Sequence, residues 1–192
     1  MIRTLQVTWL RWQGRLALLV GAQAQALRAF ESLQALDPQD PHALASRAQL
    51  EDRLGRTQQA IDLQRQVVER APKQAAGWFN LGFMLEKASL LDEALAAFTQ
   101  ATRLSPKLDR AWYGMGLVLI RLHRFDEAVD ALRKNTELQP MSPYGWYQLA
   151  RVHVDRQEPD EALRIIRHLQ GFEPKVAAQL ERETGLRVAR SG

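Results

Sequence analysis

The chain has 192 residues, of which 46% are hydrophobic and 25% are charged, and its formal net charge is +4. This composition excludes a disordered chain, because enough apolar side chains are present to build a continuous core. The absence of cysteine excludes disulfides, thiolate metal sites and thiol nucleophiles. Most of the positive charge comes from arginines scattered along the chain, which favours a GC-rich bacterial source and predicts a weak preference for acidic partners.

The N-terminal segment admits two interpretations. Arg3 and Arg11 precede the apolar run 16–20, and small residues up to Ala24 follow it, a pattern that resembles a marginal signal peptide. The same residues also fit the register of a first repeat, and cleavage after Ala24 would remove its first helix. We therefore expect a cytoplasmic protein, with a periplasmic location as the alternative if residues 1–24 act as a signal peptide. No stretch reaches the ~18–20 apolar residues that a spanning helix needs.

Three classes of residue recur at a spacing of 34 along the chain. A fixed period of this length is typical of repeat proteins, in which neighbouring units stack to bury a continuous core. The recurring residues are the prolines Pro38, Pro72, Pro106, Pro140 and Pro174, the alanines Ala26, Ala60, Ala94, Ala128 and Ala162, and the small residues Gly14, Ala48, Gly82, Gly116 and Ala150.

Each period predicts two antiparallel amphipathic helices. Apolar residues follow the i, i+3, i+4, i+7 spacing of a helix, and a break near Lys87–Ser89 separates the two helices of the third unit. A proline such as Pro106 ends the second helix, because it disfavours the α conformation in the residue before it. The predicted units are 7–40, 41–74, 75–108, 109–142 and 143–176, of which the first two are degenerate, and 177–192 are predicted to form a capping helix that stops at Gly185 and an arginine-rich tail.

Local signals add detail to this scheme. Asp40 and Ser142 each precede a proline, which predicts that both side chains cap a helix. His123 is predicted to start a second helix and to face solvent. His153 takes a position at which other units carry a packed leucine, so it is predicted to be a buried core histidine.

The pattern of Trp78, Leu81, Gly82, Ala94, Phe98 and Pro106 resembles the tetratricopeptide repeat family. The resemblance covers about residues 7–176. It implies an all-α fold, a right-handed α-solenoid of five tandem helix–turn–helix repeats followed by a C-terminal capping helix.

The same resemblance implies a concave face lined by the first helix of each unit. Positions on this face lie off the packing stripe, yet several carry aromatic side chains next to arginines, a combination that dominates binding at interfaces. The alternative is that these aromatic side chains only fill contacts between adjacent first helices. The predicted groove residues are Phe79, Asn80, Phe83, Lys87, Arg110, Tyr113, Leu117, Arg121, Tyr144, Tyr147, Gln148 and Arg151.

Signals for catalysis are missing from the sequence. The four histidines have no metal-ligand spacing, and no phosphate loop or nucleophile motif is present. Acidic pairs such as Asp92–Glu93 recur with the unit, which assigns them to helix starts. The sequence therefore predicts that the chain is not an enzyme and uses no cofactor or metal.

We expect a scaffold, adaptor or assembly chaperone that binds another protein in the groove of the third, fourth and fifth repeats. The expected ligand is an extended or helical peptide with apolar and some acidic residues. Chaperone tails are not expected, because only Asn80 and Arg110 match the family's carboxylate clamp. A constitutive subunit of a larger complex, or a homo-oligomer, is the alternative to this function. By itself the chain is expected to be a monomer or a weak homo-oligomer. An RNA-associated protein ranks last, because a basic stripe is missing.

Overall fold

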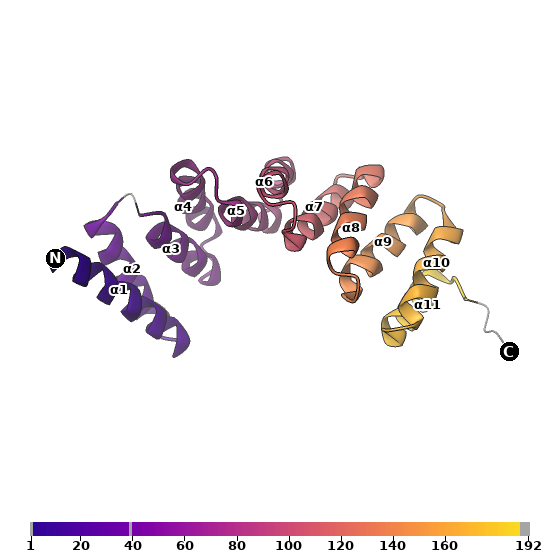
Figure 1. The fold of residues 1–192 in the computed structure, drawn as a ribbon, viewed down its shortest axis with the longest axis horizontal. Helices are drawn as coiled ribbons and strands as arrows, with labels where there is room; N and C mark the ends of the chain where they lie inside the picture. The colour runs from indigo at the N-terminus through magenta and orange to yellow at the C-terminus, as the bar shows by residue number, and fades with distance from the viewer. Residues whose placement is uncertain (1, 39, 189–192) are drawn as a thin grey trace. The chain divides into compact units, whose positions relative to one another are not determined.

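The structure is a computed structural model that describes residues 2–38 and 40–188. These residues form eleven α-helices and no strand, which confirms the predicted all-α class. The chain divides into two compact units, residues 1–90 and 91–192, and each has its own core. Figure 1 shows the helices in chain order. The division falls inside the predicted repeat 75–108, between its two helices.

The first unit contains five helices, and consecutive helices pack against each other. Its core includes Phe30 and Leu33 together with Leu50, all buried. The first helix begins at Ile2, before residue 7, the predicted start of the first repeat. The helices are α1 (Ile2–Leu19), α2 (Gln23–Leu36), α3 (Pro41–Arg53), α4 (Thr57–Arg70) and α5 (Ala75–Lys87).

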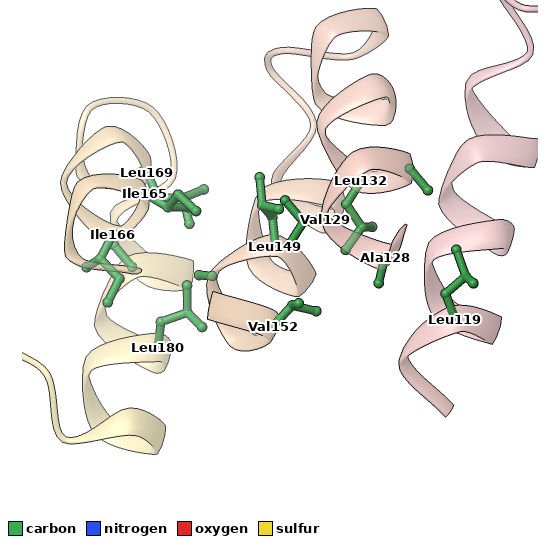
Figure 2. Close-up of a cluster of buried hydrophobic side chains, with 13 residues drawn as sticks. Leu119, Ala128, Val129, Leu132, Leu149, Val152, Ile165, Ile166, Leu169 and Leu180 are labelled. Atoms are coloured by element: carbon green, nitrogen blue, oxygen red, sulfur yellow. The ribbon is translucent and has the colours of Figure 1, made fainter. Parts of the chain in front are cut away.

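The second unit contains six helices, and its core runs from α7 to α11 (Figure 2). The last helix ends at Thr184 and is followed by Gly185, whose left-handed φ of 73° is what the predicted stop requires. That helix starts at Pro174 rather than at 177, and residues 189–192 of the predicted tail lie outside the described residues. The helices are α6 (Leu91–Leu104), α7 (Asp109–Arg121), α8 (Phe125–Leu138), α9 (Pro143–Asp155), α10 (Pro159–Gln170) and α11 (Pro174–Thr184).

Small residues of the 34-residue lattice permit close helix packing within a repeat. A β-carbon on Gly116 would lie 2.7 Å from Cγ of Leu132, and one on Gly14 would lie 2.5 Å from Cε1 of Phe30. Both distances are shorter than any van der Waals contact between carbons. The close approach of α7 to α8, and of α1 to α2, therefore requires glycine at these two positions.

At three sites one period apart, a tryptophan indole is hydrogen-bonded to the backbone carbonyl of the proline six residues before it. The indole Nε1–H of Trp78 donates to the carbonyl oxygen of Pro72 at 2.8 Å, and Trp112 donates to Pro106 at 2.9 Å. Trp146 and Pro140 repeat the bond at 2.8 Å. A half-buried indole N–H needs such a partner. The bond joins the start of a first helix to the end of the preceding second helix.

The turn inside each repeat contains one left-handed residue, and these residues also recur every 34 positions. Their φ angles are 74° at Gly21, 77° at Gly55, 61° at Ser89, 56° at His123 and 61° at Gln157. The expectation that His123 starts a helix is wrong, because α8 begins at Phe125 and His123 is the left-handed residue of the turn before it. His123 is exposed, as predicted.

Replacing His123 by glycine is expected to raise the free energy of unfolding by about 0.5–1 kcal/mol, because only glycine adopts this φ without steric cost. Urea unfolding followed by circular dichroism measures the change. His123→Ala is the matched control, since it also removes the ring contact with Phe125, whose centroid lies 5.7 Å away, but keeps the β-carbon. Equal stability of the two variants would refute the explanation.

The two predicted capping residues differ in the structure. Asp40 accepts a hydrogen bond from the backbone N–H of His42 at 3.0 Å, so this cap is confirmed. Burial would raise the pKa of Asp40, but the hydrogen bonds from Arg11 and His42 outweigh burial and hold that pKa below its usual value. Ser142 makes no side-chain capping bond to α9, so that prediction is wrong. With Pro143 at the first helical position, one backbone donor is already absent there.

Candidate functional site

A hollow of about 470 Å³ opens in the second unit among α7, α9 and α11. The chain has three tyrosines, and all of them line this hollow. Two glutamines add amide groups that can both donate and accept hydrogen bonds. We call this site the tyrosine hollow; its lining residues are Tyr113, Pro143, Tyr144, Tyr147, Gln148, Glu173, Val176 and Gln179.

Helical periodicity places the side chains of the tyrosine hollow. Tyr144 and Tyr147 are three residues apart on α9, and Gln148 follows one residue later, so the three share one helical face. The buried face of α9 is a different one, formed by residues such as Leu149 and Val152. Tyr144 is 70% exposed and therefore contributes little to the core.

Burial, hydrogen bonds and charges shift the pKa values of two of the phenols in this hollow. Burial raises the pKa of Tyr113, and the hydrogen bond with Gln148 offsets only part of that effect. The hydroxyl of Tyr147 donates to Oε2 of Glu183 at 2.5 Å, which raises the pKa of Tyr147 and lowers the pKa of Glu183. The guanidinium of Arg151 lies 5.8 Å from the centre of the Tyr147 ring, within cation–π range.

The other predicted groove residues of the second unit lie on α7 outside the hollow. Arg110 and Arg121 are exposed, Leu117 is half-buried, and none of the three is among the residues that line the hollow. The structure thus brings together Tyr113 with three predicted residues of α9, and Arg151 beside them.

Four predicted groove residues belong to α5 in the first unit. Phe79 and Asn80 are half-buried there, and Phe83 is 50% exposed. The ammonium of Lys87 is 2.7 Å from a carboxylate oxygen of Asp52 on α3. Lys87 is therefore engaged in an ion pair within its own unit.

The sequence interpretation missed the contribution of α11. Glu173, Val176 and Gln179 line the tyrosine hollow, and Glu183 binds Tyr147. The signal was present in the sequence, because Leu180 follows Trp146 by one full period. A helix in that register packs as the next first helix and contributes to the same surface.

The lining of the hollow offers both apolar surface and hydrogen-bonding groups to a ligand. The faces of the phenol rings and the side chain of Val176 can surround an apolar side chain, while the amides of Gln148 and Gln179 can bond to a peptide backbone. Among residues 2–38 and 40–188, no group of histidine and acidic side chains is arranged to hold a metal ion. No helix in the described part of the chain combines the length and apolar character needed to cross a membrane.

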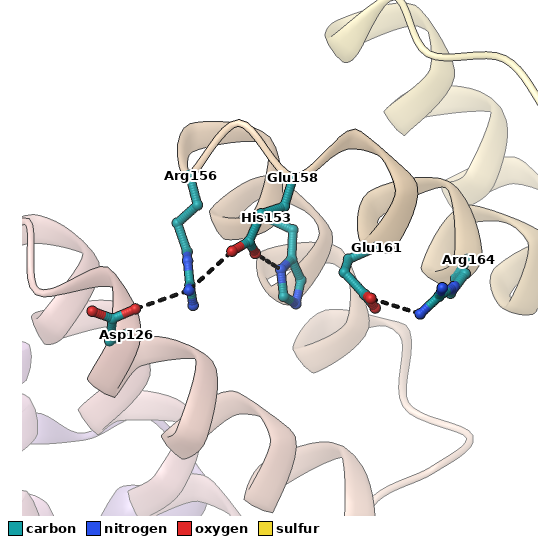
Figure 3. A network of polar contacts seen from close by, with 6 residues as sticks. All are labelled: Asp126, His153, Arg156, Glu158, Glu161 and Arg164. Atoms are coloured by element: carbon teal, nitrogen blue, oxygen red, sulfur yellow. Dashed lines mark hydrogen bonds and ion pairs between the residues drawn. The ribbon is translucent and has the colours of Figure 1, made fainter.

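A second hollow, of about 670 Å³, has a charged lining, and several of these charged side chains are paired with each other (Figure 3). The guanidinium of Arg156 lies 2.9 Å from Asp126 and 3.0 Å from Glu158. Glu158 also lies 2.7 Å from Nδ1 of His153, a hydrogen bond that lowers the pKa of Glu158. His153 is only 2% exposed, which confirms the predicted buried histidine. This network joins α8 to the turn between α9 and α10, so we assign it a structural role.

Comparison with protein families identifies the repeat. The segments 13–75, 45–109 and 113–171 match a family model described as tetratricopeptide repeat. Together they cover more than half of the chain. No protein among the curated sequences matches the chain.

Solved structures with the same fold cover nearly the whole chain. A crystal structure of MamA protein is 19% identical, with a TM-score of 0.82 over 96% of this chain and 98% of that one. MamA from Desulfovibrio magneticus RS-1, residue 41 to the end, is 21% identical, with a TM-score of 0.79 over 93% and 96%. YrrB, a tetratricopeptide repeat protein with an unusual peptide-binding site, is 18% identical, with a TM-score of 0.77 over 88% of both chains. These similarities confirm the predicted α-solenoid class.

Proposed function

Because the chain belongs to the tetratricopeptide repeat family, we propose that it is a non-catalytic scaffold or adaptor that holds a peptide segment of a partner protein in the tyrosine hollow. Repeat proteins of this kind bind ligands on extended surfaces formed by successive helices. The peptide-binding site of the similarly folded YrrB supports the same class of ligand.

One observation carries this proposal: every tyrosine of the chain lines one hollow. Tyrosine is a preferred anchor at protein interfaces, since it presents a large rigid surface and a hydroxyl at low entropic cost. Tyr144, at 70% exposure, exposes most of its ring to solvent and is not required by the core. Filling contacts between adjacent helices does not explain a side chain that remains so exposed.

The chemistry of the hollow defines the partner segment. An apolar side chain would enter between the phenol rings and Val176. The backbone of the segment would bond to Gln148 and Gln179. An acidic residue next to the apolar anchor would lie near Arg151, while Glu173 would disfavour acidic residues at the end of the hollow nearest α11.

Tyr144→Ala is expected to weaken peptide binding about 30-fold or more, as truncation of an aromatic anchor does. Peptides selected from a random displayed library against the unmodified chain provide the ligand, and calorimetry measures its affinity for both proteins. We expect unchanged helicity in the variant, because the side chain is exposed.

Met141→Ala is the matched control. Met141 is 67% exposed and does not line the tyrosine hollow, so its truncation should leave affinity unchanged. Selected peptides that bind Tyr144→Ala as tightly as the unmodified chain would show that the hollow is not the binding site.

A further inference from the structure

The first helix exposes a row of large apolar side chains. Leu5, Trp9, Trp12, Leu16 and Leu19 are 67%, 65%, 68%, 54% and 83% exposed. We call this row the α1 seam. Its steps alternate between four and three residues, which is the a/d spacing of a coiled coil.

This row is not the face that α1 uses to pack in its own repeat. Val7, Leu10 and Ala17 pack on the core with α2, and Gly14 lies against Phe30. The helix therefore has two apolar faces, of which the core of the unit uses one.

The equivalent face of α3 is buried against a neighbouring helix, which shows the role that such a face has within the repeat array. One period after Trp9 and Leu16 lie Ala43 and Leu50, which are 0% and 1% exposed in a core shared with α2. The same positions on α1 carry large apolar residues with no helix packed on them in the described part of the unit. A stacking face of this kind normally has a polar surface in terminal repeats.

The size of the exposed surface approaches that of a stable interface. With Val20, which is 69% exposed, the α1 seam presents on the order of 600 Å² of apolar surface. Each partner buries about 800 Å² in a standard interface. A hollow of about 630 Å³ beside the seam, lined by Trp9, Leu16 and Val20 and by residues of α2, provides further surface.

We propose that the α1 seam pairs with the α1 seam of a second copy of this chain, in an antiparallel two-helix contact. In that pairing Leu5 lies opposite Leu16 of the second copy and Trp9 lies opposite its Trp12. The spacing of the seam makes it complementary to itself, as a two-fold contact requires.

Charge favours a second copy over a lipid surface. The residues that flank the seam are Gln6, Thr8, Gln13 and Arg15, so two copies bring few like charges together. Binding to anionic lipid typically uses clusters of about 4–8 basic residues. The guanidinium of Arg11 is already held by Asp40 at 2.7 Å.

Light scattering after size exclusion tests the proposal on the full chain over a concentration series. We expect twice the chain mass of 21.9 kDa at high concentration. Trp12→Glu should raise the dissociation constant about 30-fold or more, with helicity kept because Trp12 is exposed. Met141→Glu places the same charge on an exposed apolar site elsewhere and should leave the dimer intact. A monomer at every concentration overturns the proposal.

Cross-linking tests the pairing without disturbing the aromatic side chains. The chain contains no cysteine, so Leu5→Cys and Leu16→Cys each introduce a single thiol. A mixture of the two variants should form a disulfide-linked heterodimer, and neither should link to itself. Self-linking of each variant contradicts the antiparallel pairing. A monomer that sediments with phosphatidylcholine vesicles containing phosphatidylglycerol overturns the proposal and assigns the seam to a membrane surface.

Discussion

Replacing Leu132 by alanine is expected to lower the free energy of unfolding of the second unit by about 2–5 kcal/mol. Leu132 is fully buried on α8 and lies in the cluster that joins α7 through α11 (Figure 2). Its side chain occupies the space that Gly116 leaves open on α7. Alanine would leave a cavity that the surrounding helices fill only in part, so both transfer and cavity costs apply.

Urea unfolding followed by circular dichroism measures this loss, and Met141→Ala serves as the control. Met141 is apolar but 67% exposed, so its truncation should change stability by less than about 0.5 kcal/mol. A Leu132→Ala variant as stable as the control would mean that the contact of α7 with α8 does not hold the second unit together.

Replacing Gly116 by valine is expected to cost about 3 kcal/mol, at the upper end of overpacking effects. Even the first carbon of the new side chain would lie 2.7 Å from both Cγ and Cδ2 of Leu132. Leu132 is 0% exposed and lies within the buried core cluster of the second unit. The helices must therefore separate, which removes contacts along their length.

The double variant Gly116→Val with Leu132→Ala tests whether overpacking against Leu132 causes the loss of stability. We expect it to be more stable than the sum of the two single effects predicts, by about 1–3 kcal/mol, because the valine enters the cavity left by the leucine. The same unfolding measurement on all four proteins completes the cycle. Additive effects would show that Gly116 is not needed for close approach.

The period of the sequence predicted much of the fold for a physical reason. The helix pairs α1–α2 and α7–α8 solve the same packing problem, so a small residue such as Gly116 and a large one such as Leu132 return at fixed positions. The bond from Trp112 to Pro106 adds a second constraint of the same period. Because these constraints act between neighbouring helices, they produce a periodic pattern that can be recognised in the sequence.

Other features could not be predicted because they depend on what surrounds a residue. Ser142 has the right type for a cap, but its side chain makes no capping bond. The left-handed turn residues share a period, but only Gly21 and Gly55 are glycines, so the residue type of His123 carried no signal. Trp9 is exposed because no helix among residues 2–38 and 40–90 covers that face of α1, which periodicity does not reveal.

The candidate site was predicted in part. Three tyrosines and Gln148 meet in one hollow. Their positions on the helix faces, read from the sequence, were enough to predict that these residues lie together. The residues of α11 line the hollow because that helix packs beside α9, where the first helix of a further repeat would lie. Whether Phe79 and Phe83 on α5 take part in binding stays a prediction.

Fluorine NMR of the chain labelled with 3-fluorotyrosine tests the central claim most directly. All three tyrosines line the hollow, so the spectrum reports on this site alone. Titration with a selected peptide should shift the resonances of Tyr113, Tyr144 and Tyr147 together, with one common affinity. Labelling with 5-fluorotryptophan is the control, and the resonances of packed indoles such as Trp112 should shift little. Peptide binding that leaves all three tyrosine resonances in place would contradict the account.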